Sequence, residues 1–158
     1  MIKIVVSSCL LGAPVRHDGR DKKSDHPILE RWLREGRVVS ACPEMLGGLG
    51  TPRPPAEIVR KDGERHVITN EGRDVTAAFE SGAEEVARQA RDEGVRLAVL
   101  KAGSPSCGTS FVYDGTFTKT PVPGAGVTTA LLRERGIAVF SEEELEAADR
   151  YLASLEEP

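Results

Sequence analysis

Strand-like and helix-like segments alternate along most of this chain, and that order limits the folds open to it. Residues 2–7 form a continuous β-branched apolar run, which is typical of a strand covered on both faces. Apolar residues recur at helical spacing over residues 26–35 before Gly36, and a second short strand is predicted over residues 37–41. These segments predict a βαβ unit, in which the two strands run parallel.

The alternation continues to the end of the chain. Further helices are predicted over residues 75–93 and 127–135, and further strands over residues 95–100 and 137–140. Asp74 is the expected N-cap of the longer helix. Ser141 and Glu144 fit a capping box for a last helix that runs to about residue 155. Four strands separated by helices indicate a parallel sheet.

Two hairpins are predicted outside this sheet, one within residues 57–69 and one around residues 113–115. Each contains an Asp-Gly pair, which is a strong signal for a tight turn between strands. The chain has 158 residues, which is enough for one domain with its own core. We therefore predict a single α/β domain over residues 1–158, a small doubly wound fold of Rossmann-like or flavodoxin-like type with a mostly parallel sheet of about four strands.

Charge and hydropathy exclude some classes of partner. The net charge is −4, with 21 basic residues scattered among 25 acidic ones. A protein that binds long nucleic acid needs a basic stripe, and none is present, so no such partner is expected. No apolar stretch is long enough for a signal peptide or a membrane span, which predicts a cytoplasmic protein without a membrane partner.

The three cysteines, Cys9, Cys42 and Cys107, are the most informative functional candidates. Their number is odd, and thiols stay reduced in the cytoplasm, so a disulfide framework does not explain them. Each follows the carboxyl end of a different predicted strand, in a turn rich in Pro, Gly or Ser. Because the carboxyl ends of parallel strands share one edge of the sheet, where α/β proteins bind ligands, we expect the three thiols to meet there.

Three thiols at one edge are compatible with a metal or cluster site, a nucleophile with helper groups, or a redox relay. Three unrelated buried thiols are the plain alternative. Structural zinc takes four ligands in closely spaced pairs, and this chain has no Cys-x-x-Cys pair. Iron-sulfur clusters are held by thiolates, and a cubane with three cysteines leaves one iron open to a substrate. The cluster fits an enzyme better than it fits an electron carrier.

Five separated motifs give the chain a resemblance to a known family. They are Ser-Ser-Cys-Leu-Leu-Gly at residues 7–12, Cys-Pro-Glu at 42–44, Thr-Pro-Arg-Pro-Pro at 51–55, Lys-Ala-Gly-Ser-Pro-Ser-Cys-Gly at 101–108 and Gly-Ala-Gly-Val-Thr at 124–128. In this order they resemble the thiouracil desulfidase family over nearly the whole chain. The resemblance implies a 4Fe-4S cluster bound by the three cysteines, with one open iron that takes the substrate's sulfur.

The same resemblance implies the other site residues. Glu44 is the expected catalytic glutamate and Ser104 the expected serine, with Ser106 as a second candidate. Lys101 could offset negative charge on the cluster or the substrate. Without the resemblance, these residues are explained as turn-forming residues or a solvated strand end.

The activity that the resemblance implies is hydrolytic removal of sulfur from a thiolated uracil, either 2-thiouracil or a 4-thiouracil nucleotide, with release of sulfide. Soft iron suits this reaction because it coordinates the sulfur and acts as a Lewis acid without net redox change. Two alternatives stay open: a cluster-bearing module for ligand binding or sulfur sensing, and a cluster-free hydrolase with a cysteine nucleophile.

Histidines and one glycine-rich loop have simpler explanations. His17, His26 and His66 lie far from the cysteine motifs in sequence and are expected at the surface or at helix caps. The loop at residues 124–126 precedes a helix and could cradle a phosphate, but Gly-x-Gly alone is a weak signal and its simple explanation is turn geometry.

Overall fold

A parallel sheet of four strands forms the centre of the structure, a computed structural model that describes residues 1–157. The strands are β1 (Ile4–Ser7), β2 (Val38–Ala41), β5 (Leu97–Leu100) and β8 (Ala138–Ser141), in the spatial order β2-β1-β5-β8. All adjacent pairs run parallel, with Ile4 of β1 beside Val38 on one side and Leu97 on the other. The predicted α/β fold is confirmed.

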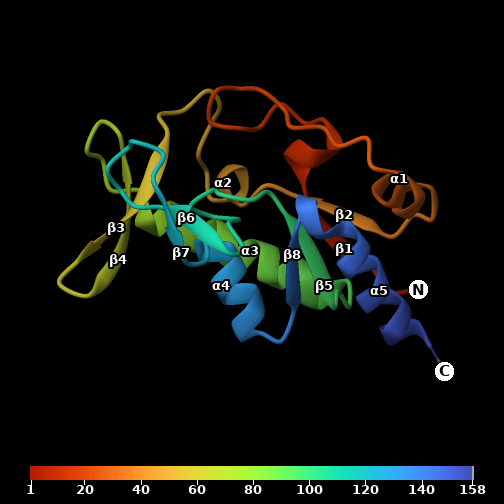
Figure 1. Cartoon of the computed structure of the whole chain (residues 1–158). Coiled ribbons are helices and arrows are strands. Elements are labelled where there is room, and N and C mark those ends of the chain that lie inside the picture. Colours follow the sequence, from red (N-terminus) through yellow and green to blue (C-terminus); the bar gives the residue numbers. More distant parts are fainter. Residues whose placement is uncertain (158) are drawn as a thin grey trace.

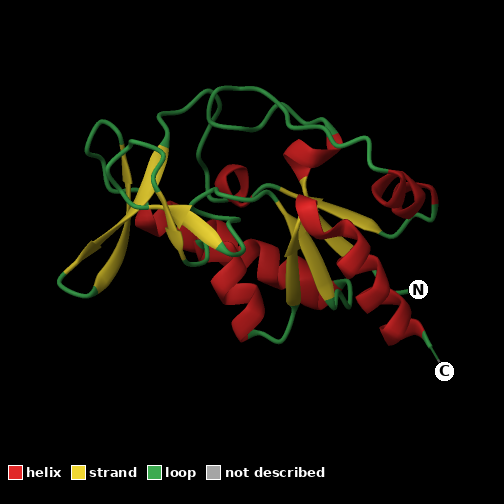
Figure 2. Cartoon of the chain, in the orientation of Figure 1, coloured by secondary structure: helices red, strands yellow, loops and turns green. Residues whose placement is uncertain are grey.

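Helices cover both faces of this sheet (Figures 1 and 2). The first face carries α1 (Pro27–Arg34) and α5 (Leu145–Glu156), and the second carries α3 (Thr76–Asp92) and α4 (Val127–Glu134). Side chains alternate along β1, so that Ile4 and Val6 pack into the core with α1 and α5, whereas Val5 packs with α3 and α4. The continuous apolar run of this strand follows from its burial on both sides.

The predicted caps at the helix N-termini are present, with one exception. The capping box at Ser141 and Glu144 is present, and it opens the short 3₁₀ turn η2 (Glu142–Glu144) that leads into α5. The longer helix α3 has Val75 at its N-cap, not Asp74. The Asp74 carboxylate instead accepts the Thr76 N–H at 2.9 Å, and hydrogen bonds from Thr76, with one from His66, lower the pKa of Asp74 to about 2.

Both predicted hairpins are present beside the main sheet, but residues 114–120 connect the strands of the second one in place of a tight turn at Asp114 and Gly115. The first pairs β3 (Ala56–Lys61) with β4 (Glu64–Thr69), and the second pairs β6 (Phe111–Tyr113) with β7 (Pro121–Pro123). In Figure 1 the hairpins lie together at one end of the molecule, next to the carboxyl edge of the sheet. None of the helices within residues 1–157 is both long and apolar enough to cross a membrane.

Two short helices directly after strands were not predicted. They are η1 (Ser8–Leu11), which follows β1, and α2 (Pro43–Leu46), which follows β2. Four residues are too few for a periodic apolar pattern to show in a sequence. Glycine holds α2 in place: a Cβ added at Gly82 of α3 would lie 1.9 Å from the Pro43 carbonyl oxygen, so only glycine permits this close contact between the two helices.

Candidate active site

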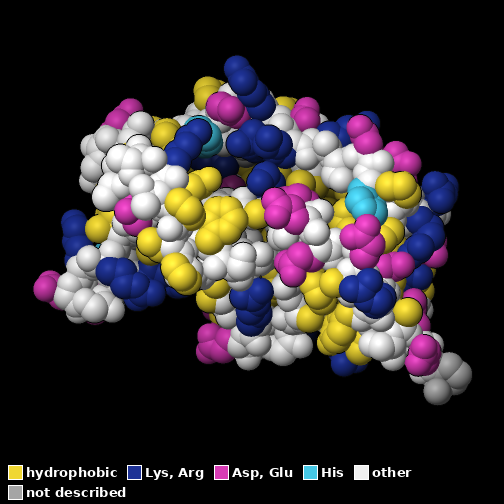
Figure 3. Space-filling model, in the orientation of Figure 1, with side chains coloured by type: hydrophobic (Ala, Val, Ile, Leu, Met, Phe, Trp, Pro, Cys, Tyr) yellow, Lys and Arg dark blue, Asp and Glu magenta, His cyan; other side chains and the backbone are white. Residues whose placement is uncertain are grey.

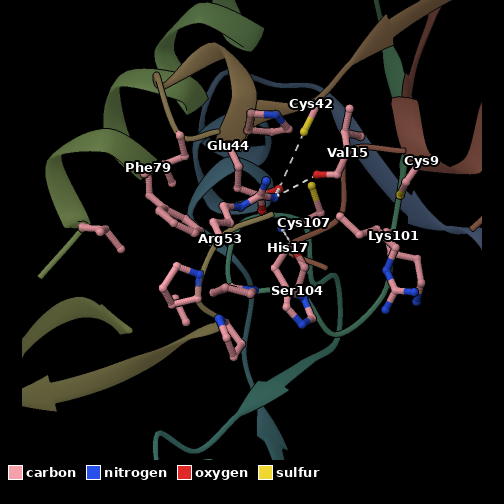
Figure 4. Close-up of a pocket in the computed structure, with 18 of the residues that line it drawn as sticks. Cys9, Val15, His17, Cys42, Glu44, Arg53, Phe79, Lys101, Ser104 and Cys107 are labelled. Carbon is pink, nitrogen blue, oxygen red and sulfur yellow. Dashed lines mark hydrogen bonds and ion pairs between the residues drawn. The ribbon is translucent and has the colours of Figure 1, made fainter. Parts of the chain in front are cut away.

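All three cysteines lie at the carboxyl edge of the sheet and line one cavity of about 570 Å³ (Figure 4). Cys9 belongs to η1 after β1, Cys42 is the N-cap residue of α2 after β2, and Cys107 lies in the loop after β5. Glu44, Ser104 and Lys101 line the same cavity. The structure therefore brings together residues from three strand ends that are far apart in sequence.

Burial dominates the acid-base behaviour of the three thiols. Burial, followed by the nearby Glu44 carboxylate, raises the pKa of Cys9 and of Cys107 and raises the pKa of Cys42 to about 11. A cysteine nucleophile needs the opposite, because its thiolate forms readily only when the pKa is lowered by positive charge or a helix N-terminus. The free thiols are therefore poorly suited to act as nucleophiles on their own.

The donor set of three thiols suits a cluster better than a single metal ion. Ligands of one tetrahedral ion lie about 2.3 Å from it, which brings their sulfur atoms to roughly 4 Å from one another. Within residues 1–157, no three His, Cys, Asp or Glu side chains are grouped tightly enough for that. An iron-sulfur cluster holds its cysteines farther apart, since each binds a different iron. Three soft sulfur donors that line one cavity are the kind of ligands that such a cluster takes.

Glu44 extends from α2 into the cavity and is held there by Arg53 (Figure 4). The Arg53 guanidinium donates to Glu44 Oε2 at 3.0 Å, and it also donates to the carbonyl oxygens of Val15 and Gly50. Glu44 Oε2 lies 3.7 Å from the Cys42 sulfur. Burial raises the pKa of the Glu44 carboxyl, and the Arg53 charge opposes that rise. This carboxyl is thus held in one orientation beside a cysteine.

The two candidate serines have different surroundings. Ser104 lines the cavity, and its Oγ accepts the N–H groups of Cys107 at 2.7 Å and Ser106 at 3.2 Å. Both acceptor positions are then occupied, so the Ser104 O–H is left to donate to a ligand. Ser106 is fully buried, its Oγ lies 2.7 Å from Thr128 Oγ1, and it is not among the residues that line the cavity.

Lys101 lies at the cavity wall in a fixed orientation. Its Nζ donates to Glu142 Oε1 at 3.3 Å and to the Ala102 carbonyl oxygen at 3.0 Å. The Glu142 carboxylate also accepts the Ala102 N–H. A lysine restrained in this way presents a positive charge near Cys9 without moving freely in solvent.

The glycine-rich loop before α4 supports the Cys107 loop. The N–H groups of Val127 and Thr128 donate to the carbonyl oxygens of Pro105 and Ser106, at 2.9 and 2.8 Å. These are N–H groups at the start of a helix, and a phosphate would need them free. The loop at residues 124–126 is therefore explained by close backbone packing at Gly126, and neither of its glycines has a positive φ.

Gly126 is the tightest point of this contact. A Cβ at Gly126 would lie 2.4 Å from the Ser106 carbonyl carbon and oxygen, so Gly126→Ala has to displace the Cys107 loop. We expect a loss of about 1–3 kcal/mol in the free energy of unfolding and weaker retention of iron. Urea unfolding and iron analysis would measure both. Gly124→Ala is the matched control, because its nearest contact is Val112 Cγ2 at 3.4 Å; equal behaviour of the two variants would contradict this role.

Sequence reasoning missed two groups at the cavity, Arg53 and His17. His17 lines the cavity instead of serving as a plain surface or cap residue, and its carbonyl oxygen accepts the Arg53 N–H at 2.6 Å. Arg53 lies in the Thr-Pro-Arg-Pro-Pro motif at residues 51–55, which was a signal without an assigned role. The segment around His17 has no periodic pattern that could have placed it.

The loops that carry Arg53 and His17 help to give the cavity a basic rim. Arg16 and Lys119 also line it, and Figure 3 shows Lys and Arg side chains gathered around a hollow on this face. Burial lowers the pKa of His17, and the charges of Arg16, Arg53 and Lys119 lower it further, although Asp18 opposes them. The rim is therefore positively charged in a chain whose net charge is negative.

The fold and the site place the chain among the open α/β proteins, which bind their ligands at the carboxyl edge of a parallel sheet, and here three cysteines and a restrained carboxyl line the cavity at that edge. The chain belongs to the 2-thiouracil desulfurase family, whose sequence profile matches residues 4–144.

Two relatives support this assignment. The solved structure of a [4Fe-4S]-dependent thiouracil desulfidase, TudS, is 48% identical and superposes with a TM-score of 0.91, covering 97% of this chain and 99% of that one. An uncharacterised protein of Bacillus subtilis, YbbK, is 41% identical over 148 residues, which is 90% of this chain and 97% of the relative.

Proposed function

We propose that this chain is a thiouracil desulfidase that holds a 4Fe-4S cluster with Cys9, Cys42 and Cys107 and leaves one iron open. The observation that carries the proposal is the shared cavity of three strand-end thiols and the Glu44 carboxyl. Family membership and the likeness to TudS support the same activity. Reduced thiols and this cofactor suit a reducing compartment, so we place the enzyme in the cytoplasm.

The proposed reaction is hydrolysis without net redox change. One water adds to the carbon of the thiocarbonyl group, the carbon-sulfur bond breaks, and the products are a uracil and hydrogen sulfide. The bound cluster supplies a thiophilic, Lewis-acidic iron that draws electron density from the thiocarbonyl carbon. The protein has to supply proton transfer, orientation of the pyrimidine ring and charge balance.

Glu44 is the proposed general base and acid. As a carboxylate it takes a proton from the attacking water, and it then returns that proton to the departing sulfur. Burial raises the pKa of this carboxyl, which makes it a stronger base than a solvated glutamate. Arg53 keeps the carboxyl aimed into the cavity, so water and substrate meet it in one orientation.

Ser104 and Lys101 are proposed to bind the substrate. The Ser104 O–H has both acceptor positions occupied by backbone N–H groups, so it donates to an oxygen or nitrogen of the ring. The Lys101 ammonium faces negative charge on the ring as it develops during attack. For Ser106 we propose a structural role, because its hydroxyl pairs with Thr128 outside the cavity.

Anaerobic reconstitution tests the proposal directly. We expect about four irons and four sulfides per chain, visible charge-transfer absorbance, and release of sulfide and uracil from 2-thiouracil. A cluster-loaded protein that binds thiopyrimidines without turning them over would support the sensing module instead. Activity of a protein without iron would support the cluster-free hydrolase, which the raised thiol pKa values disfavour.

The basic rim favours a nucleotide over a free base as substrate. A pyrimidine ring fills only part of a cavity of about 570 Å³, and Arg16 and Lys119 line it beside His17. A phosphate group bound by these side chains would anchor the nucleotide while its ring reaches the cysteines. We therefore propose that a thiouracil nucleotide is used more efficiently than the free base.

Removal of the positive charge at the rim should lower kcat/KM for the nucleotide more than for the free base. For the double variant Arg16→Gln/Lys119→Gln we expect kcat/KM to fall about tenfold for 4-thiouracil nucleotide, since two contacts of roughly 0.7 kcal/mol each add up to that factor. The value for free 4-thiouracil should change less than twofold. Arg60→Gln/Lys61→Gln removes the same charge from the exposed end of β3 and serves as control. An equal loss with both substrates would argue against phosphate binding.

A further inference from the structure

Ser7, the last residue of β1, joins two parts of the site that lie on neighbouring strands. Its side chain is almost fully buried, with 3% of the residue exposed. Its Oγ accepts the Lys101 N–H at 3.0 Å, immediately after β5. The same Oγ lies 3.8 Å from the Cys107 sulfur and is oriented to donate to it. Ser7 thus contacts one of the three proposed cluster ligands from the end of β1.

The direction of the second hydrogen bond follows from the first. A hydroxyl group has one hydrogen to donate, and an N–H group can only donate. Because Lys101 N–H points at the oxygen, the Ser7 hydrogen is free for another acceptor, and the Cys107 sulfur is the acceptor that the structure provides within residues 1–157. Burial of both groups keeps water from competing for this bond.

We propose that Ser7 tunes the cluster through Cys107, by donating a hydrogen bond to the sulfur of that ligand. This inference rests on the proposed cluster at the three cysteines. A hydrogen bond to a ligating thiolate withdraws negative charge from the iron-sulfur bond, which raises the reduction potential of the cluster and makes its irons stronger Lewis acids. Ser7 is therefore a positioning residue, which acts through Cys107 and not on the substrate.

The reduction potential of the reconstituted cluster tests this role without any substrate. In Ser7→Ala the sulfur keeps its full negative charge, so we expect the equilibrium constant for one-electron reduction to fall about tenfold, a shift of about 59 mV to more negative potential. Iron content and the number of clusters per chain should stay as in the wild type. An unchanged potential in a fully loaded Ser7→Ala protein would overturn the proposal.

Two further variants distinguish tuning from a general structural effect. Ser40→Ala removes another serine hydrogen bond near the same edge, a part-buried one between Ser8 and Ser40 at 2.7 Å, which does not involve a cysteine. We expect its potential to match the wild type. Ser7→Thr keeps the hydroxyl and should restore the wild-type potential. Equal shifts in Ser7→Ala and Ser40→Ala would also overturn the proposal.

A measurement on the wild type covers the case in which Ser7→Ala fails to fold. Exchange into deuterium oxide replaces the hydroxyl hydrogen, and a hydrogen bond to Cys107 should then shift an iron-sulfur stretching band in the resonance Raman spectrum. Ser7→Thr should show the same shift. A spectrum insensitive to deuterium would refute the hydrogen bond. These readouts need only a bound cluster, so a cluster inert towards thiouracil would refute the proposed activity while leaving this test intact.

Discussion

Cys107→Ser should abolish cluster binding and lower sulfide release from thiouracil by at least about a thousandfold, the scale of losing an essential metal-borne electrophile. Serine keeps the size and polarity of the buried side chain but replaces the soft thiolate with a hydroxyl that binds iron poorly at neutral pH. The variant should fold, because Cys107 contributes a single sulfur to a core of many aliphatic side chains. Iron analysis with visible absorbance, an assay of sulfide release and far-ultraviolet circular dichroism would measure the three parts of this result.

Ser106→Ala provides the neighbouring control for that experiment. It also alters a fully buried side chain of the same loop, but its hydroxyl bonds Thr128 and does not line the cavity. We expect it to bind iron as the wild type does and to lose roughly 1 kcal/mol of unfolding free energy with its hydrogen bond. Full iron content in Cys107→Ser, with turnover intact, would show that Cys107 is not a ligand.

Apolar runs and strand ends made much of this fold predictable. The segments that form β1, β2, β5 and β8 are short, rich in Val, Leu and Ile, and separated by helical patterns. The local sequence pattern and the tertiary packing therefore favour the same structure at these positions. Parallel strands place their carboxyl ends at one edge. The convergence of three cysteines from distant segments followed from that topology alone.

Other parts of the site depend on tertiary contacts that sequence patterns do not carry. Arg53 and His17 lie in loops without periodicity, and the Arg53 guanidinium meets Glu44 only because two separate loops fold over the same edge. The choice between Ser104 and Ser106 was also open, since residues two apart in a turn can face opposite sides. The environment of each hydroxyl, two backbone N–H groups or Thr128, separates them.

The close glycine contacts explain why the loops hold their positions. Gly82 lets α3 approach the carbonyl oxygen of Pro43, next to Cys42, and Gly126 lets α4 approach the Cys107 loop. Each contact leaves no space for a Cβ, so the backbone on the cysteine side is fixed by the helix behind it. Two of the proposed ligands are thus held by rigid elements, as a site with exact ligand spacing requires.

Glu44→Gln should separate proton transfer from cluster binding. Glutamine has nearly the same shape, and its amide oxygen can still accept from Arg53, so the cavity should keep its geometry. An amide cannot take a proton from water or return one to sulfur. We expect kcat for thiouracil to fall by about a hundredfold to ten-thousandfold, the usual contribution of a general acid-base group. Iron content, the visible spectrum and the dissociation constant for thiouracil should stay close to those of the wild type.

Glu57, the other buried carboxylate that lines the cavity, provides the control for this prediction. Glu57 Oε1 accepts the N–H groups of Gly115 and Phe117 at 2.9 and 3.1 Å, so its charge is committed to backbone groups. Glu57→Gln removes one negative charge from the same cavity and should change kcat by less than about threefold, because it removes no proton carrier. If both variants lost activity equally, the cause would be the charge of the cavity. If Glu44→Gln turned over thiouracil at the wild-type rate, water would be activated without Glu44.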